Sequence, residues 1–256
     1  MMAAFAMIAV VTTPVSAAAS GNGPAIRGQV VLAGAAVHGA IVDLYVAGQT
    51  AGTATLISSE TTDARGRFTA SVANSVDEAD VLYATARGGA VNGVVVPDTV
   101  ELATSLGDLR KGKVVIDEMT TVAAGYSLAQ FAAAGVLGGA SPGLQNAARM
   151  PRNLVDLAKG EPSRFLLRDP NGTSTETLAT FNSLASIIAG CAEGTNDCDA
   201  FLDAATDAWG VRPATTWQAM TSLPKNPSGD ASGVFAQVPD DPRFTPVRTS
   251  ETAAWV

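Results

Sequence analysis

The residue types that usually perform acid–base or nucleophilic catalysis are scarce in this chain and are not arranged for it. His38 is the only histidine, and it lies in the segment AAVHGAI beside an expected turn. A catalytic histidine needs a partner that orients it, and the neighbouring sequence offers none. The serines also lack the G-x-S-x-G arrangement of a nucleophile elbow. We interpret His38 as an exposed loop residue and predict no catalytic residue, so the chain is not expected to be an enzyme.

Two groups of oxygen-bearing side chains need a separate explanation. Asp117 and Glu118 could serve as acid and base, but they stand at an expected helix start, where the helix dipole stabilises negative charge. Asp169, Asn171 and Thr173 alternate as the ligands of a calcium loop do. The glycine of that segment, however, is at the fourth position instead of the sixth, and the twelfth position has no glutamate. A turn and a helix cap explain these residues better, so the sequence predicts no metal site and no cofactor.

The two cysteines, Cys191 and Cys198, are separated by a short polar loop in the segment CAEGTNDC. An even number of cysteines in an exported chain indicates a disulfide. A redox-active pair would more often have C-x-x-C spacing, and a zinc site would need further cysteine or histidine ligands. We therefore predict a structural disulfide between Cys191 and Cys198.

The three tryptophans could form a platform on which sugars stack, but their surroundings favour another interpretation. Trp209 and Trp217 lie in alanine-rich, helix-like segments, so we expect them to fill the core. Trp255 lies in the tail without a visible partner.

Residues 1–19 resemble a secretory signal peptide, because an apolar run is followed by small residues that suit cleavage. No lysine or arginine precedes that run, and a short uncleaved anchor is the alternative. The apolar run at 3–11 is too short for a bilayer core of about 30 Å. We predict a secreted or extracytoplasmic protein with no membrane span after cleavage of the signal.

The composition limits the core and the partners. Hydrophobic residues make up 47% of the chain but aromatic residues only 5%, which favours closely spaced helices over a large aromatic pocket. The net charge is −8, and neither 20–116 nor 117–256 is basic overall. Because nucleic-acid binding depends on basic residues that neutralise phosphates, we predict no nucleic-acid partner.

The positions of these residues depend on two regions that meet within the segment 114–131, VVIDEMTTVAAGYSLAQF. Its periodicity changes there from that of a strand to that of a helix. Short strands separated by turn residues occupy 25–116 and predict an antiparallel β-sandwich. An alanine-rich all-α module is expected at 117–238, and a proline-rich extended tail at 239–256. The predicted fold class is α+β with two modules.

Several signals predict details of the helical module. The first helix is expected at 118–134, and Pro151 should kink or split a helix at 143–159. Ser141 is a candidate N-cap with Pro142 in the first turn, and 173–176 fits a capping box. The helix that follows this box should end at Gly190.

The strand region resembles the carboxypeptidase-regulatory-like, or transthyretin-like, β-sandwich. The resemblance lies in the order G-Q-V, A-I-V-D-L-Y and T-T-D-A-R-G-R-F, which includes the D-x-x-G-x-F turn of Asp63, Gly66 and Phe68. In that family the turn joins two strands and buries the aromatic ring. The resemblance therefore implies that Phe68 points inward.

The helical region is similar to the segment that precedes the NHL-repeat propeller in secreted bacterial proteins labelled as streptogramin-lyase-like. The similar segments are IDEMTTVAAGYSLAQF, GLQNAARMPRNLVDLAKG, TLATFNSLASIIAGCAEGTNDC and TWQAMTSLPKNPSGDASGVFAQV. The resemblance implies that a propeller beyond residue 256 would carry any lyase-type site. No catalytic residue can therefore be transferred to this chain.

These patterns favour a non-catalytic exported structural or interaction module, the front part of a larger secreted protein. Its partners would be a C-terminal β-propeller or cell-envelope components. Two alternatives remain: the non-catalytic portion of a propeller enzyme, and a carbohydrate-binding accessory module.

Overall fold

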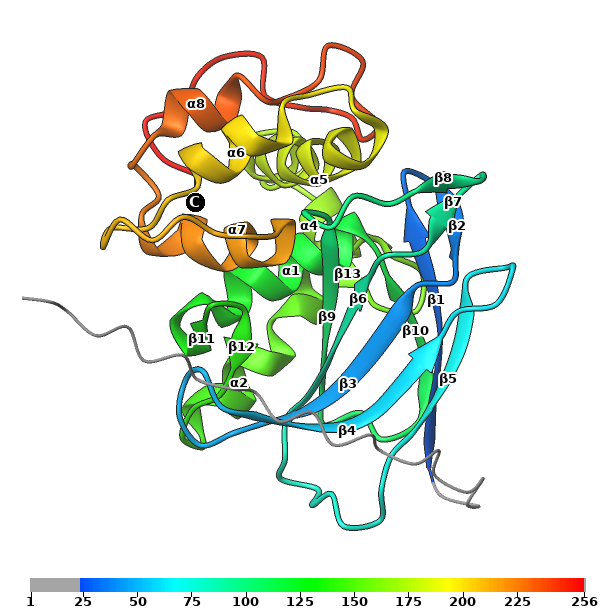
Figure 1. The fold of residues 1–256 in the computed structure, drawn as a ribbon. Coiled ribbons are helices and arrows are strands. Elements are labelled where there is room, and N and C mark those ends of the chain that lie inside the picture. Colours follow the sequence, from blue (N-terminus) through cyan, green and yellow to red (C-terminus); the bar gives the residue numbers. More distant parts are fainter. Residues whose placement is uncertain (1–23, 256) are drawn as a thin grey trace, which may run out of the picture.

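A computed structural model of the chain describes residues 24–255 and shows a mixed α+β fold (Figure 1). The expected signal peptide lies outside the described residues. Apart from two pairs of two-residue strands, the strands precede Asp117 and the helices follow it, as the change of period predicts. Within residues 24–255, no helix is long and apolar enough to cross a membrane.

The first sheet is built around strand β1, which pairs with three other strands. Its strands are β1 (Ala25–Leu32), β2 (Ala35–His38), β5 (Arg67–Ser71), β7 (Ala90–Val91), β8 (Val94–Val95) and β10 (Gly112–Ile116). β1 pairs antiparallel with β5 and parallel with β10. The expectation of an entirely antiparallel arrangement is therefore wrong at β10. This strand follows the last strand of the second sheet and enters the first sheet from a crossover, which allows parallel pairing.

The second sheet is antiparallel throughout. Its order is β4 (Ala54–Thr61), β3 (Ile41–Ala47), β6 (Leu82–Arg87) and β9 (Glu101–Gly107). The alternation of its strands directs Val42 and Leu44 into the same buried cluster as Ile26 and Val30 of β1. Residues of both sheets therefore contribute to one core.

The turn between β4 and β5 has the predicted structure. Asp63 accepts hydrogen bonds from the N–H groups of Arg65 and Arg67, each at 2.8 Å. Gly66 has a φ of 70°, a left-handed conformation that favours glycine. Phe68, at 6% exposure, is buried as expected.

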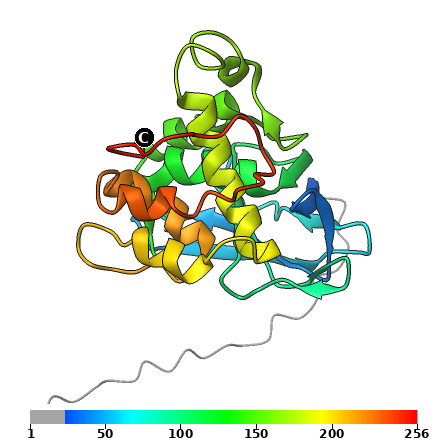
Figure 2. The same ribbon diagram turned by 90° about the horizontal axis from the view of Figure 1, so that it is seen from above.

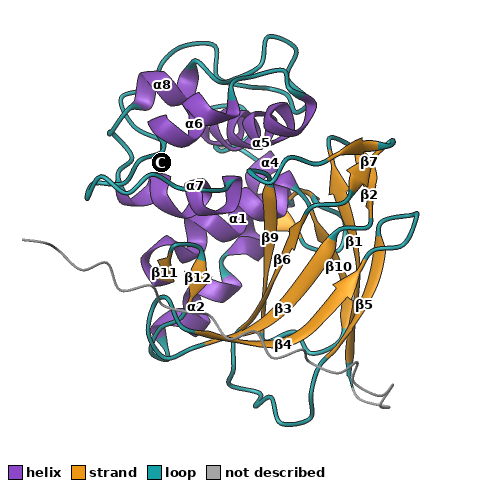
Figure 3. Ribbon diagram, viewed as in Figure 1, coloured by secondary structure: helices purple, strands orange, loops and turns teal. Residues whose placement is uncertain are grey.

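The C-terminal half consists mainly of short helices around two longer helices that are largely buried, Glu118–Leu128 and Thr177–Glu193 (Figure 3). The helices are α1 (Glu118–Leu128), η1 (Ala129–Phe131), α2 (Gly143–Arg149), α3 (Pro151–Leu154), α4 (Arg164–Leu167), α5 (Thr177–Glu193), α6 (Cys198–Ala204), α7 (Thr216–Ser222), η2 (Leu223–Lys225) and α8 (Ala231–Phe235). The two-residue strands pair as β11 (Ala132–Ala133) with β12 (Val136–Leu137) and β13 (Val155–Asp156) with β14 (Glu161–Pro162).

Helix α1 lies at the centre of the molecule, in contact with β9, α5 and α7. Gly125 makes its close approach to α7 possible, because a Cβ at that position would lie 2.6 Å from Cβ of Met220. The helices are therefore closely spaced here, as the small side chains predict.

The helix boundaries differ from the expected ones in instructive ways. The first helix ends at Leu128, after which the chain forms η1 and the β11–β12 pair. Pro151 does split the second helix, between α2 and α3. Ser141 is not an N-cap; Pro142 occupies that position, and the N–H of Leu144 donates to the carbonyl of Ala140 at 3.2 Å. Backbone carbonyls thus accept N–H groups of the first turn of α2, and no side-chain cap is involved.

The capping box expected at 173–176 does not form. Helix α5 begins after Glu176, which makes no side-chain cap, while the hydroxyl of Thr173 donates to Asp169. The N–H of Leu178 donates to the carbonyl of Asn171 at 3.3 Å instead. At its other end α5 passes the expected stop and ends at Gly194, which has a φ of 69°.

The tail from Pro239 to Trp255 contains no helix or strand and crosses helix α5 (Figure 2). The N–H groups of Phe244 and Arg248 donate to the hydroxyls of Ser186 and Ser183, at 3.2 and 2.9 Å. The tail therefore packs against the helices, and its last tryptophan belongs to the same buried cluster as the sheets.

Candidate functional site

Asp117, the first of the two adjacent carboxylates, is the N-cap of the central helix α1. Its carboxylate accepts the N–H of Thr120 at 2.8 Å, and the Thr120 hydroxyl in turn accepts the N–H of Asp117 at 2.9 Å. This reciprocal pair is a capping box. Burial raises the pKa of Asp117 to about 7, although the hydrogen bonds from Thr120 oppose that shift.

Glu118 is buried more deeply, at 1% exposure. Its Oε1 accepts the N–H of Ala33 at 2.6 Å, which ties the start of α1 to the turn between β1 and β2. Burial, followed by the charge of Asp117, raises the pKa of Glu118 to about 8, while the Ala33 N–H and Arg243 lower it. Because protein atoms cover both carboxylates, their geometry supports a structural role and gives a substrate no access.

The other candidates for chemistry remain apart. His38 is exposed at the end of β2, opposite Ala90. Asp169 and Thr173 bond to each other, and the side-chain amide of Asn171 donates to the carbonyl of Phe165 at 3.2 Å. Residues 24–255 contain no group of three or more His, Cys, Asp or Glu side chains that could hold a metal ion.

The tryptophans are placed differently from the prediction in two of three cases. Trp217 is buried as expected and donates to the carbonyl of Gly135 at 2.7 Å. Trp209, expected in the core, is 77% exposed, because the helix α6 ends before it at Ala204. Trp255, expected to lack a partner, is fully buried and donates to the carbonyl of Ala231 at 3.0 Å. The three rings therefore do not form a common stacking platform.

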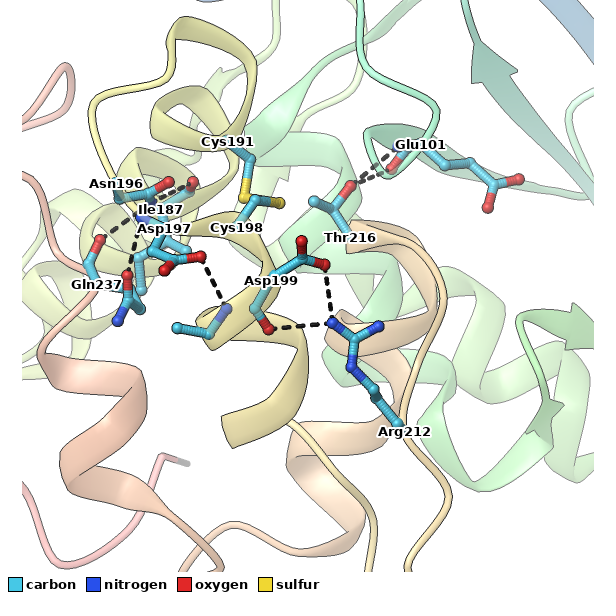
Figure 4. Close-up of a disulfide and its surroundings, with 11 residues drawn as sticks. Glu101, Ile187, Cys191, Asn196, Asp197, Cys198, Asp199, Arg212, Thr216 and Gln237 are labelled. Atoms are coloured by element: carbon cyan, nitrogen blue, oxygen red, sulfur yellow. Dashed lines mark hydrogen bonds and ion pairs between the residues drawn. A yellow bond between two sulfur atoms is a disulfide. The ribbon is translucent and has the colours of Figure 1, made fainter.

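The predicted disulfide joins the end of α5 to the start of α6 (Figure 4). Cys191 and Cys198 are bonded, with their Cα atoms 4.8 Å apart. Asn196 fastens the enclosed loop by donating to the carbonyls of Ile187 and Gln237, each at 3.0 Å. The sulfurs are thus part of the packing between two helices and the segment that leads to the tail.

A polar cluster that sequence reasoning missed lies on the second sheet. Asp43 of β3 is buried and accepts the hydroxyl of Ser59 at 2.6 Å, and Arg87 approaches its other oxygen to 3.5 Å. Tyr45 stacks on Tyr83 with ring centroids 5.0 Å apart. Burial and then the charge of Asp43 raise the pKa of Tyr45 to about 12, so this hydroxyl keeps its proton at neutral pH. A carboxylate within an apolar strand, on the face opposite to Val42 and Leu44, was the available signal.

Glu101 of β9 borders this cluster and has a structural partner. It accepts the hydroxyl of Thr215 at 2.7 Å, and its carbonyl accepts the hydroxyl of Thr216 at 2.7 Å. Burial raises its pKa, whereas Thr215 and then Arg87 lower it. These bonds attach the start of helix α7 to the sheet, so Glu101 is engaged in positioning a helix.

Four exposed cations gather on the outer face of the first sheet. Arg27 of β1, Arg67 of β5, and Lys111 and Lys113 at β10 line an open depression of about 700 Å³. None of the four makes an ion pair within the part of the chain that the structure describes. This cationic face is the candidate functional site, and it lies on a protein with a net charge of −8.

The cationic face arises from strand register, which the sequence does not reveal. Arg27 lies directly opposite Lys113 on one side and Thr69 on the other, and Arg67 pairs with the neighbouring Gln29. Alternation along the strands sends all of these side chains outward. The two basic positions of β10 are far from Arg27 in sequence, so only the parallel β1–β10 pair brings them together.

Comparisons of the chain with protein-family models, with curated proteins and with solved structures found no match. The site is therefore described by its own geometry, as an exposed cationic surface whose four charges make no ion pair among the described residues.

Proposed function

We propose that this chain is a non-catalytic interaction module that acts outside the cytoplasm, as the front part of a larger secreted protein. The bond between Cys191 and Cys198 carries the proposal, because structural disulfides persist in oxidising compartments and are rare in the cytosol. The apolar leader of the sequence supports the same location.

The burial of the carboxylates supports the non-catalytic part of the proposal. Asp117 caps a helix, Glu118 binds a turn, and Glu101 holds the start of α7. A catalytic acid or base has to reach the substrate, and these groups already bind parts of the protein. Among the described residues, no carboxylate makes an ion pair with the exposed His38.

The fold underlying this function would be a carboxypeptidase-regulatory-like β-sandwich followed by an alanine-rich helical module. The two sheets with a shared inner core and the Asp63–Phe68 turn support the sandwich. The association with an NHL propeller depends on the sequence resemblance of the helical region.

The experiment is expression of the full chain in a bacterium, beside a matched variant that lacks residues 1–19. We expect the full chain in the extracytoplasmic fraction, with Cys191 and Cys198 joined in a non-reduced peptide by mass spectrometry. The truncated variant should stay in the cytoplasm. Free thiols in the full chain, or equal distribution of both proteins, would contradict export.

A further inference from the structure

We propose that the cationic face binds an acidic polysaccharide, with Arg27 and Lys113 at the centre of the contact. The first observation is the register. Arg27 and Lys113 are directly opposed on neighbouring strands, where like charges destabilise a sheet. No acidic side chain lines the depression, so the fold retains this repulsion without internal compensation.

Acidic side chains also lie near the edges of the cationic face. Asp63, at the end nearest Arg67, already accepts two backbone N–H groups. On the other side, Asp156 and Glu161 line a second depression that shares Lys113, and both lie within 4.0 Å of Lys159. The backbone N–H of Arg67, and also the charge of its side chain, lower the pKa of Asp63, so Arg67 is partly compensated. Arg27, Lys111 and Lys113 make no ion pair in the part of the chain that the structure describes and remain available to an external anion.

The architecture favours side-chain recognition of a polymer over strand addition by a peptide. β1 is hydrogen-bonded to β5 on one side and to β10 on the other, so the strand that carries Arg27 has no free edge for an added strand. A ligand that reaches both Arg27 and Lys113 lies across the face, whose strands stand on the side of the molecule away from α1 and α7 (Figure 3). Thr69 beside the cations supplies a hydroxyl for hydrogen bonding, and Gln29 supplies its side-chain oxygen, while its amide nitrogen donates to the carbonyl of Arg65.

The same face lacks the features that single-stranded nucleic acids use. Bases bind by stacking on exposed aromatic rings, and the only aromatic residue of this depression, Phe68, is buried beneath it. The choice of a polysaccharide over an intracellular polyanion rests on the extracytoplasmic location under the proposed function.

The test measures binding of the full chain to polygalacturonate at low and moderate salt, with neutral dextran as the uncharged reference. We expect salt-sensitive binding to polygalacturonate and none to dextran. The double variant Arg27→Gln/Lys113→Gln should lose about tenfold in affinity, as two exposed ion pairs allow. Removal of the like-charge pair should leave the thermal midpoint unchanged or raise it.

A matched control removes the same charge elsewhere. Arg149→Gln/Arg212→Gln changes two exposed arginines that line neither the depression at Arg27 nor the one beside it and should retain the affinity within about twofold. Absence of binding by the wild type, or equal loss in both double variants, would overturn the proposal. Stronger binding to single-stranded DNA or polyglutamate than to polygalacturonate would also overturn it. Free thiols in the exported material would contradict the proposed function alone, whatever the binding result.

Discussion

Replacement of Glu118 by Gln should change the pH dependence of stability, because this carboxylate is buried at the start of the central helix. Its pKa is raised from 4.5 to about 8 in the folded protein. Between these two values the folded chain retains a proton that the unfolded chain has released. The free energy of unfolding therefore falls as pH rises through this range, and the loss is complete above about pH 8.

The magnitude follows from the size of the shift. A difference of about 3.5 pH units corresponds to about 5 kcal/mol at 1.36 kcal/mol per unit, which is an upper limit because Asp117 titrates beside it. In Glu118→Gln the carbonyl oxygen can still accept the Ala33 N–H, but the new amide N–H groups need partners. That penalty is about 1–3 kcal/mol and does not depend on pH.

The variant should therefore be less stable than the wild type near pH 5 and more stable near pH 9, with a relative change of about 2–5 kcal/mol. Urea unfolding followed by tryptophan fluorescence measures this, because Trp217 and Trp255 are buried. Part of the slope should remain in the variant, since the pKa of Asp117 is also raised.

The control is Glu78→Gln, which alters an exposed glutamate and should leave the pH profile unchanged. Parallel profiles for the wild type and Glu118→Gln would refute the reasoning. Parallel profiles would mean that the Glu118 carboxylate is ionised in the folded protein, because either water or a positively charged partner stabilises its charge.

Two further perturbations test the turn and the disulfide. Gly66→Ala should cost about 1–3 kcal/mol, because its new Cβ would lie 2.5 Å from the carbonyl oxygen of Val30. Gly88→Ala is the control, because Gly88 has a similar φ of 65° and a Cβ added there would meet nothing within 4 Å. An equal loss of stability for both variants in urea unfolding would show that the contact with Val30 is not the cause. Cys191→Ser/Cys198→Ser should lower stability by about 2–2.5 kcal/mol, and no loss, or a loss of the whole fold, would contradict this estimate.

The sequence by itself determined the features that depend on local pattern. The change from alternating to helical periodicity placed the end of the strands at Ile116 and the start of α1 at Glu118. The Asp63–Phe68 turn and the break at Pro151 were also predictable, because turn chemistry and the missing N–H of proline act within a few residues. The same holds for the Cys191–Cys198 pair, whose short loop keeps the two sulfurs close.

Only the tertiary structure decided which distant residues meet. Trp255 is buried because the tail returns across α5, whereas Trp209 is exposed because α6 ends before it. The caps expected at Ser141 and 173–176 failed because nearby backbone carbonyls supplied the acceptors instead.

The candidate site shows the same limit most clearly. Counted along the sequence, neither half of the chain is basic, and the sequence alone predicted no cationic surface. The parallel pairing of β1 with β10 places Lys113 beside Arg27 across a long stretch of chain. The net charge of a stretch of sequence does not reveal which residues of neighbouring strands lie opposite each other, because strand register is set by the packing of the whole core.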